Sequence, residues 1–184
     1  MTFASIPAQA HNLDRPSEWV ARWAHSIKPL GTVLDLACGG GRNSRFLAAL
    51  GLRVCAVDRD PHALEVLGPI AGVTARLADL ENGSWPLEDL VFDGVVVTNY
   101  LHRPLFPRIL DAIAPGGLLI YETFAAGNER FGKPSNPDFL LRPGELLDAV
   151  RGRLRVVAYE NLEVIAPKPA SIQRICASAL SGEV

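Results

Sequence analysis

The sequence has few of the residues that build metal centres or disulfide frameworks. Its 184 residues include three cysteines and four histidines. Cys38, Cys55 and Cys176 lie far apart in the chain, and no C-x-x-C pair or Cys/His spacing of a zinc site occurs. We therefore predict no metal site, and we interpret at least two of the cysteines as small buried apolar residues of a protein in a reducing compartment.

Long apolar runs and an excess of basic charge are also missing. No stretch reaches the roughly 20 apolar residues that a membrane span needs. The opening residues MTFASIPAQAHNLDRP lack the basic region and long apolar region of a secretory signal. The net charge is −2, whereas proteins that bind phosphate backbones are usually basic. We expect a cytoplasmic protein without a membrane or nucleic-acid partner.

The composition is that of an ordinary folded protein, with 48% hydrophobic and 21% charged residues. The length suits one domain over residues 1–184. Residues 1–14 are predicted to be a loose N-terminal arm. Residues 124–142 are rich in proline and glycine and too long for a simple connection, so they are predicted to form a lid-like loop. The oligomeric state stays open between monomer and homodimer.

Apolar runs of strand length alternate with helical patterns along the chain. The expected strands are 31–37, 53–58, 73–79, 92–99, 116–124, 153–165 and 171–180, and the expected helices are 16–28, 42–51, 61–68, 103–114 and 143–152. This alternation predicts an α/β fold with a doubly wound, mostly parallel seven-stranded sheet. Residues 166–170 are too few for a parallel crossover, so the last two strands should form an antiparallel C-terminal hairpin at one edge.

A glycine triplet follows the first expected strand. Gly39, Gly40 and Gly41 let the backbone turn sharply and let a ligand approach without Cβ clashes. The next helix would point its free N–H groups at the same place. Asp58 ends the second strand about 20 residues later, where a carboxylate accepts hydrogen bonds from ribose hydroxyls. These features predict a ligand that contains adenosine.

The ligand could be a dinucleotide or S-adenosylmethionine. The dinucleotide fingerprint G-x-G-x-x-G would place its third glycine at Ser44, so that glycine is missing. Asp35, inside the first strand, would repel a pyrophosphate but attract an ammonium or sulfonium group. The charge of the ligand therefore favours S-adenosylmethionine.

Five segments resemble the motifs of class I S-adenosylmethionine-dependent methyltransferases. They are VLDLACGGG, VDRD, LADLENGSW, FDGVVVTNYLH and ILDAIAPGGLLIYE, and the resemblance covers roughly residues 15–180. It implies a Rossmann-like fold. The segments CGGGRNSRFLA and LRPGELL are similar to the small stand-alone bacterial enzymes of the tellurite-resistance type. The segment TNYL stands where methyltransferases of amide or base nitrogens have [DNS]-P-P-[YF], which disfavours that subgroup.

The resemblance also implies roles for individual residues. Asp35 would reach the methionine amino group, Gly39 and Gly41 would shape the loop, Asp58 would bind the ribose and Arg59 would flank the adenine. Asp79 would take the adenine amino group with the backbone N–H of Leu80, and Asn99 and Tyr100 would lie beside the methionine portion. Ala37 stands where many members have glycine, so we expect a negative φ there. The alternatives are that Asp35 only caps a turn and that the acidic residues after the second strand only cap the next helix.

Two residues are candidates for catalysis. His102 follows the fourth strand and could act as a general base near pH 7, although a cap or surface role is equally consistent with its position. Tyr121 ends the fifth strand beside Glu122, and only one of the two can face the crevice. A soft anion would need no base. Three basic residues of the long loop region, Arg130, Lys133 and Arg142, would favour an anionic acceptor.

The sequence thus predicts methyl transfer from S-adenosylmethionine to a small-molecule acceptor, with a soft or anionic nucleophile as one option. Two alternatives remain. The chain could bind the cofactor without independent catalysis, since no single base is well supported. Less consistent with the glycine pattern is a nicotinamide-dependent reductase module.

Overall fold

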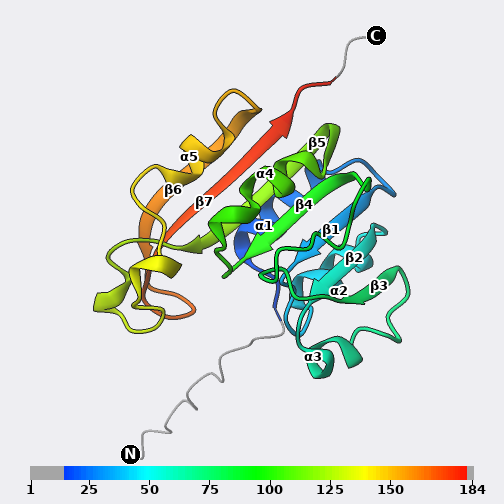
Figure 1. Cartoon of the computed structure of the whole chain (residues 1–184), viewed down its shortest axis with the longest axis horizontal. Coiled ribbons are helices and arrows are strands. Elements are labelled where there is room, and N and C mark those ends of the chain that lie inside the picture. Colours follow the sequence, from blue (N-terminus) through cyan, green and yellow to red (C-terminus); the bar gives the residue numbers. More distant parts are fainter. Residues whose placement is uncertain (1–14, 182–184) are drawn as a thin grey trace, which may run out of the picture.

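The computed structural model describes residues 15–181, so the predicted arm over residues 1–14 lies outside the described residues. Its centre is a seven-stranded sheet with the order β3-β2-β1-β4-β5-β7-β6 (Figure 1). The strands are β1 (Thr32–Leu36), β2 (Arg53–Asp58), β3 (Val73–Leu77), β4 (Phe92–Thr98), β5 (Ile113–Phe124), β6 (Leu154–Val164) and β7 (Ala170–Ala179).

The strand directions confirm the predicted doubly wound sheet. The pairs β1–β2, β2–β3, β1–β4 and β4–β5 are parallel. Strand β7 is antiparallel to both β5 and β6, so the last two strands form a hairpin at the β6 edge. From β1 to β3 successive strands are added toward one edge of the sheet, whereas β4 and β5 are added on the other side of β1. In sheets of this type the ligand binds at that point, beyond the carboxyl ends of the strands.

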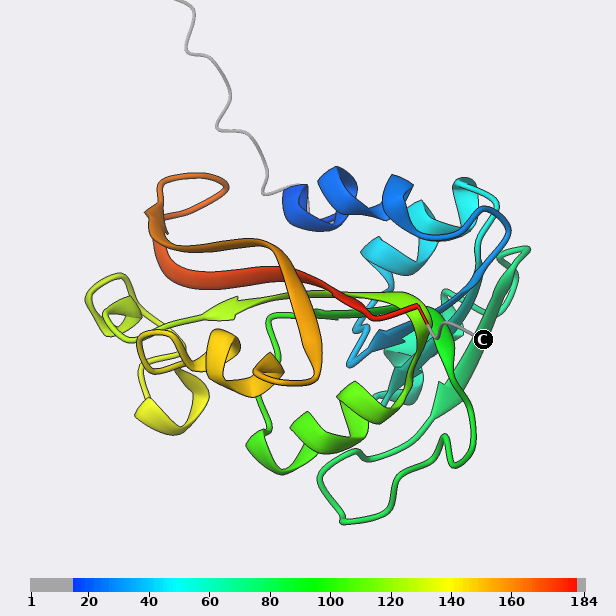
Figure 2. The ribbon, with the colours of Figure 1, turned by 90° about the horizontal axis from the view of Figure 1, so that it is seen from above.

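Helices cover both faces of the sheet (Figure 2). The helices are α1 (Glu18–Trp23), α2 (Arg42–Ala49), α3 (Pro61–Glu65), α4 (Phe106–Asp111) and α5 (Glu145–Val150), with short 3-10 turns η1 (Ala24–Ser26), η2 (Arg103–Leu105), η3 (Asn128–Arg130) and η4 (Pro137–Phe139). Trp19, Leu47 and Leu64 of α1, α2 and α3 pack in one apolar core. Ile109 of α4 and Leu146 of α5 pack in the other. The fold is therefore a three-layer α/β/α arrangement.

Several boundaries differ from the expectation. The helix predicted over 103–114 is a 3-10 turn followed by α4, which ends at Asp111. Pro107 lies in the first turn of α4, where the missing N–H of proline has no helical partner to lose. Leu50, the C-cap residue of α2, is 36% exposed. Ser44 and Asn43 are buried on that helix instead, because they serve the site described below.

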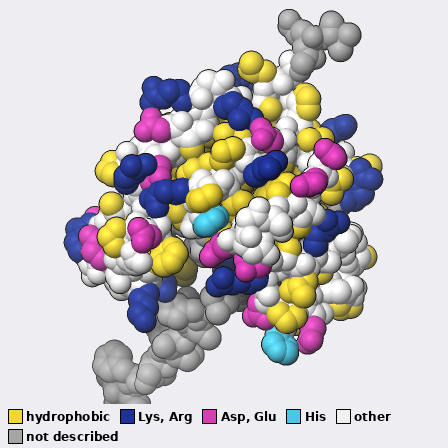
Figure 3. Space-filling view, viewed as in Figure 1, with side chains coloured by type: hydrophobic (Ala, Val, Ile, Leu, Met, Phe, Trp, Pro, Cys, Tyr) yellow, Lys and Arg dark blue, Asp and Glu magenta, His cyan; other side chains and the backbone are white. Residues whose placement is uncertain are grey.

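Charged side chains of both signs share the face shown in Figure 3, where Lys and Arg are interspersed with Asp and Glu. This mixture agrees with the small net charge of −2. None of the helices in residues 15–181 has the length and apolar character that a membrane crossing requires.

Candidate functional site

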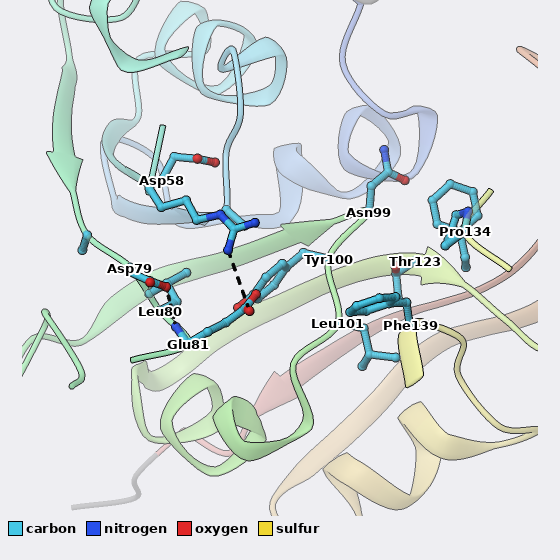
Figure 4. Close-up of a pocket in the computed structure, with 14 residues that line it drawn as sticks. Asp58, Asp79, Leu80, Glu81, Asn99, Tyr100, Leu101, Thr123, Pro134 and Phe139 are labelled. Carbon is cyan, nitrogen blue, oxygen red and sulfur yellow. Dashed lines mark hydrogen bonds and ion pairs between the residues drawn. The ribbon is translucent and has the colours of Figure 1, made fainter. Parts of the chain in front are cut away.

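A cavity of about 440 Å³ lies at the carboxyl ends of the five parallel strands (Figure 4). Every one of these strands contributes to its wall, either through its last residues or through the loop that follows. Most of the residues predicted to bind a cofactor line it: Ala37, Asp58, Arg59, Asp79, Leu80, Asn99 and Tyr100. Asp35, Gly39 and Gly41 are not part of the wall. The cavity thus lies at the point between β1 and β4 where the order of successive strands reverses.

Asp58 holds the glycine loop against the end of β2. Its Oδ2 accepts a hydrogen bond from the backbone N–H of Gly39 at 2.7 Å, and its Oδ1 accepts one from Asp60 at 3.0 Å. The carboxylate has about four acceptor positions in all, so two remain for a ligand. Asp60 caps α3 through its side chain, as the capping alternative expected. The contact of Asp58 with the ribose stays a prediction. The structure also shows a second role for Asp58, which is to fix the glycine loop.

The two glycines of the G-x-G pattern have different reasons to be glycine. Gly41 has a φ of +71°, and a Cβ there would lie 2.2 Å from Cδ2 of Leu67. Gly39 has a φ of +53°, but a Cβ there would meet nothing within 4 Å. Gly41 is therefore required by packing and by conformation, whereas Gly39 is required by conformation and leaves open space in front of the backbone.

Ala37 does not have the negative φ that was expected. Its φ is +52°, and Asn99 has a φ of +56°. These residues follow the neighbouring strands β1 and β4, and both line the cavity. The left-handed conformation costs a residue with a Cβ about 1–2 kcal/mol. The expectation was wrong because the turn that starts the glycine loop requires a positive φ at position 37. Strained backbone conformations of this kind are common at binding sites.

Asp35 is a buried carboxylic acid with an incomplete set of partners. Only 1% of its surface is exposed. Its Oδ2 accepts a hydrogen bond from Ser44 at 2.5 Å, but its buried Oδ1 has no partner among the described residues. Burial raises the pKa of Asp35 to about 6, against the lowering effect of Ser44. A cationic ligand group near Oδ1 would satisfy this oxygen. The contact with the methionine amino group stays a prediction.

Asn43 is a site-supporting residue that the sequence analysis did not single out. Its Oδ1 accepts a hydrogen bond from the N–H of Ser17 at 2.9 Å, and its Nδ2 donates to the hydroxyl of Thr98 at 3.0 Å. It thereby links α1, α2 and the end of β4. A polar residue at the second position of the helix after a glycine loop was the available signal, but the sequence does not reveal that the side chain is buried.

One side of the cavity is acidic. Figure 4 shows Asp58, Asp79 and Glu81 grouped on this side. Asp79 is exposed, and its Oδ1 accepts a hydrogen bond from the N–H of Glu81 at 2.9 Å. Arg59 faces Glu81 with 3.8 Å between nitrogen and oxygen. These acceptors lie after β2 and β3, where the resemblance places the ribose and the adenine.

The opposite side of the cavity is mainly apolar. Leu101, Phe124, Pro134 and Phe139 lie there together with Thr123. Figure 4 shows Thr123, Leu101 and Phe139 close together and Pro134 above them. Pro134 and Phe139 come from the segment 124–142, so this segment supplies part of the wall. That it moves as a lid stays a prediction. None of these residues was predicted as a wall residue, because segments distant in the sequence bring them together.

Tyr121 is not available to a ligand, so its predicted catalytic role is wrong. It is 1% exposed, and its hydroxyl donates to the carbonyl of Tyr100 at 2.8 Å. Burial raises its pKa. Glu122 points to the other face of the sheet and accepts a hydrogen bond from Ser17 at 2.7 Å. The strand continues to Phe124, and its last two residues reach the cavity instead.

The other proposed reactive groups also lie outside the cavity wall. His102 is half-buried and does not line the cavity, although its neighbour Leu101 does. We therefore assign it no contact with an acceptor. Arg130 is paired with Glu163, and Arg142 lies 3.4 Å from Glu145. Neither they nor Lys133 line the cavity, so the expected attraction for an anionic acceptor has no support in this wall.

The chain matches known methyltransferases in sequence. Residues 33–117 match the family described as "Methyltransferase domain". The chain is also similar to the ubiquinone biosynthesis O-methyltransferase of Xanthomonas axonopodis pv. citri (strain 306). The two are 36% identical over 115 residues, which is 53% of this chain and 45% of that protein. The chain spans about half the length of the curated relatives that it matches.

Solved structures show the same fold. TehB from Haemophilus influenzae superimposes with a TM-score of 0.74 at 19% identity, over 87% of this chain and 61% of that one. A TehB-like SAM-dependent methyltransferase from Corynebacterium glutamicum (ATCC 13032) gives a TM-score of 0.65 at 19% identity, over 89% of each chain. Residues 33–117 are therefore a methyltransferase domain, and the chain has the fold of the class I S-adenosylmethionine-dependent methyltransferases. TehB and the TehB-like enzyme share this fold with the chain.

The residues present fit the cofactor of this class. The acidic side of the cavity offers acceptors for hydroxyl and amino groups. The buried Oδ1 of Asp35 has no partner within the described part of the chain, as expected near a cationic group. Positions 39 and 40 have open space where a Cβ would lie, so a ligand can approach the backbone there. Of the described residues that line the wall, Arg59 alone is basic, whereas a pyrophosphate would require several basic groups.

Proposed function

We propose that this protein transfers the methyl group of S-adenosylmethionine to a small-molecule acceptor. The observation that carries the proposal is the division of one cavity into an acidic side and an apolar side, located at the carboxyl ends of the parallel strands. The acidic side suits the nucleoside, and the apolar side suits the acceptor. The family match and the shared fold support this proposal.

The cofactor would be held by residues from four strand ends. Asp58 would accept hydrogen bonds from the ribose, and Asp79 with the N–H of Leu80 would recognise the adenine. Ala37 and Asn99, which lie between the two sides, would flank the methionine portion. When bound, the cofactor supplies a methyl carbon that its positive sulfur already activates. The protein's own contribution is then to orient the acceptor and to exclude water.

Among residues 15–181, the apolar side contains no group suited to remove a proton. Thr123 is the polar residue there, and a threonine hydroxyl does not act as a base at neutral pH. Tyr100 lies between the sides, and burial, with Glu81 as a second cause, raises its pKa, so it stays protonated. We therefore infer that the acceptor is a small molecule with an apolar body whose nucleophile, such as a thiolate, arrives without its proton.

Calorimetry tests the cofactor part of this proposal. S-adenosylhomocysteine should bind in the micromolar range, and NADH should not bind. Asp58→Ala should weaken this binding by about 1–3 kcal/mol, since it removes charged hydrogen bonds. Because Asp58 also holds the glycine loop, Asp60→Ala, which removes only the cap of α3, is the matched control. Binding of NADH in preference to S-adenosylhomocysteine would instead establish the reductase alternative.

A panel of acceptors tests the catalytic part. Apolar thiols, metalloid oxyanions, carboxylates and amines are incubated with S-adenosylmethionine, and S-adenosylhomocysteine formation is followed. Apolar thiols should be methylated in preference to the hydrated oxyanions. If S-adenosylhomocysteine binds but no member of the panel reacts above background, the chain is better described as a protein that binds the cofactor without independent catalysis.

A further inference from the structure

Arg103 connects three parts of the chain at the apolar side of the cavity. It begins η2, two residues after the wall residue Leu101. Its Nε and one terminal nitrogen donate to the two carboxylate oxygens of Glu145 at 2.6 and 3.0 Å. Its terminal nitrogens also donate to the backbone carbonyls of Asp138 and Leu140, at 2.7 and 2.8 Å. One guanidinium therefore joins the loop after β4, the segment 138–140 and α5.

The two carbonyls flank a residue of the cavity wall. Phe139 lies between Asp138 and Leu140 and lines the apolar side. Its side chain is 52% exposed, so burial in a core does not fix its position. The turn η4 that carries it has only three residues. Backbone hydrogen bonds to Asn136 and Pro137 close this turn, and the buried Leu140 anchors its end. Arg103 adds the side-chain hydrogen bonds that tie the carbonyls on both sides of Phe139 to the loop after β4.

The other partner of Arg103 is a fixed negative charge. Glu145 is 6% exposed, and its carboxylate also accepts the backbone N–H of Arg142 at 2.7 Å. Burial by itself would raise the pKa of Glu145, but the hydrogen bonds from Arg103 and Arg142 lower it to about 2. The carboxylate is therefore ionised at neutral pH. A bidentate pair of this kind fixes the plane of the guanidinium, and with it the direction of the remaining N–H groups.

We propose that Arg103 is a positioning residue for the acceptor side of the cavity. It does not line the cavity and does not act on the reaction directly. It fixes the backbone on both sides of Phe139 relative to Leu101, and so sets the width of the apolar compartment. The assignment of this compartment to the acceptor rests on the proposed function, whereas the link between Arg103 and Phe139 does not.

A tryptophan at position 139 provides the test. In the Phe139→Trp background, Arg103→Ala should increase acrylamide quenching of the added fluorescence about twofold, because local order is lost. Arg103→Lys should recover part of the difference, since an ammonium keeps the charge and some donors but not the planar fork. Arg130→Ala is the matched control. It removes another ion pair of the same segment, with Glu163, and should leave the quenching unchanged. If Arg103→Ala does not fold, Arg103→Gln takes its place in the same comparison.

Cofactor affinity separates this proposal from the proposed function. The Arg103 variants should bind S-adenosylhomocysteine within about threefold of the parent, a change of under 1 kcal/mol, because the acidic side is untouched. Unchanged quenching in a folded Arg103 variant, or an equal change in Arg130→Ala, overturns the positioning role. If the parent itself fails to bind S-adenosylhomocysteine, the proposed function fails while the quenching comparison still decides the role of Arg103.

Discussion

The buried carboxyl of Asp35 should make the stability of the protein depend on pH. Burial raises its pKa from 3.8 to about 6, so the folded state binds the proton more tightly than the unfolded state does. The stabilising contribution of the protonated carboxyl is complete below about pH 4 and is lost as pH rises through about 6. A difference of about two pKa units corresponds to roughly 3 kcal/mol at pH 8. In the ligand-free protein, ionisation of Asp35 thus lowers the free energy of unfolding.

Asp35→Asn removes the charge and keeps an acceptor for Ser44. We expect the free energy of unfolding at pH 8 to rise by about 1–3 kcal/mol, less any cost of the amide N–H₂ that has no partner. At pH 4 the variant and the parent should differ little. Urea unfolding between pH 4 and pH 8.5, without ligand, measures both values. Affinity for S-adenosylhomocysteine should fall in the same variant, because Oδ1 no longer attracts a cation.

Ser44→Ala is the control for this reasoning. The hydrogen bond from Ser44 lowers the pKa of Asp35, so its removal should move the pH transition of stability upward. Identical pH profiles for the parent and Asp35→Asn would refute the link between burial, charge and stability at this position. A variant that gains stability equally at pH 4 and pH 8 would refute it as well, since only the ionised form carries the cost.

Two further substitutions follow from the same geometry. Ala37→Gly relieves a left-handed residue, worth about 1–2 kcal/mol, but adds entropy to the unfolded chain, worth about 0.4–1 kcal/mol. Urea unfolding should show a net gain of between zero and about 1.6 kcal/mol, with unchanged affinity for S-adenosylhomocysteine. A loss of stability would contradict the positive φ. For Glu145, the lowered pKa of about 2 means that its contribution is present above about pH 4.5 and is lost as pH falls toward 2. Glu145→Gln should remove roughly 3 kcal/mol at pH 7 and flatten the acid limb of the stability curve, whereas an acid limb as steep as the parent's would exclude the ion pair as its origin.

Local patterns in the sequence were sufficient to predict the fold and the residues on the acidic side of the cavity. Strand and helix periodicity predicted the parallel sheet, and the short connection over 166–170 predicted the antiparallel hairpin. Asp58 was found from its position at the end of the second strand, and Asp79 from the resemblance of LADLENGSW to a methyltransferase motif. Both line the cavity because the ends of parallel strands meet at one edge of a sheet. These features depend on residues close together in the chain, so the sequence by itself determined them.

The apolar side of the cavity was decided only by the tertiary structure. Phe139 and Leu101 lie on one wall, and Arg103 binds the carbonyls on both sides of Phe139 across 35 and 37 positions of the chain. No local pattern encodes such a contact. The burial of Tyr121 and the positive φ of Ala37 likewise depend on how β5 and the glycine loop pack. Periodicity specifies which face of an element is apolar. Which distant side chain meets that face, and which buried oxygen is left without a partner, follows only from the packing of the whole chain.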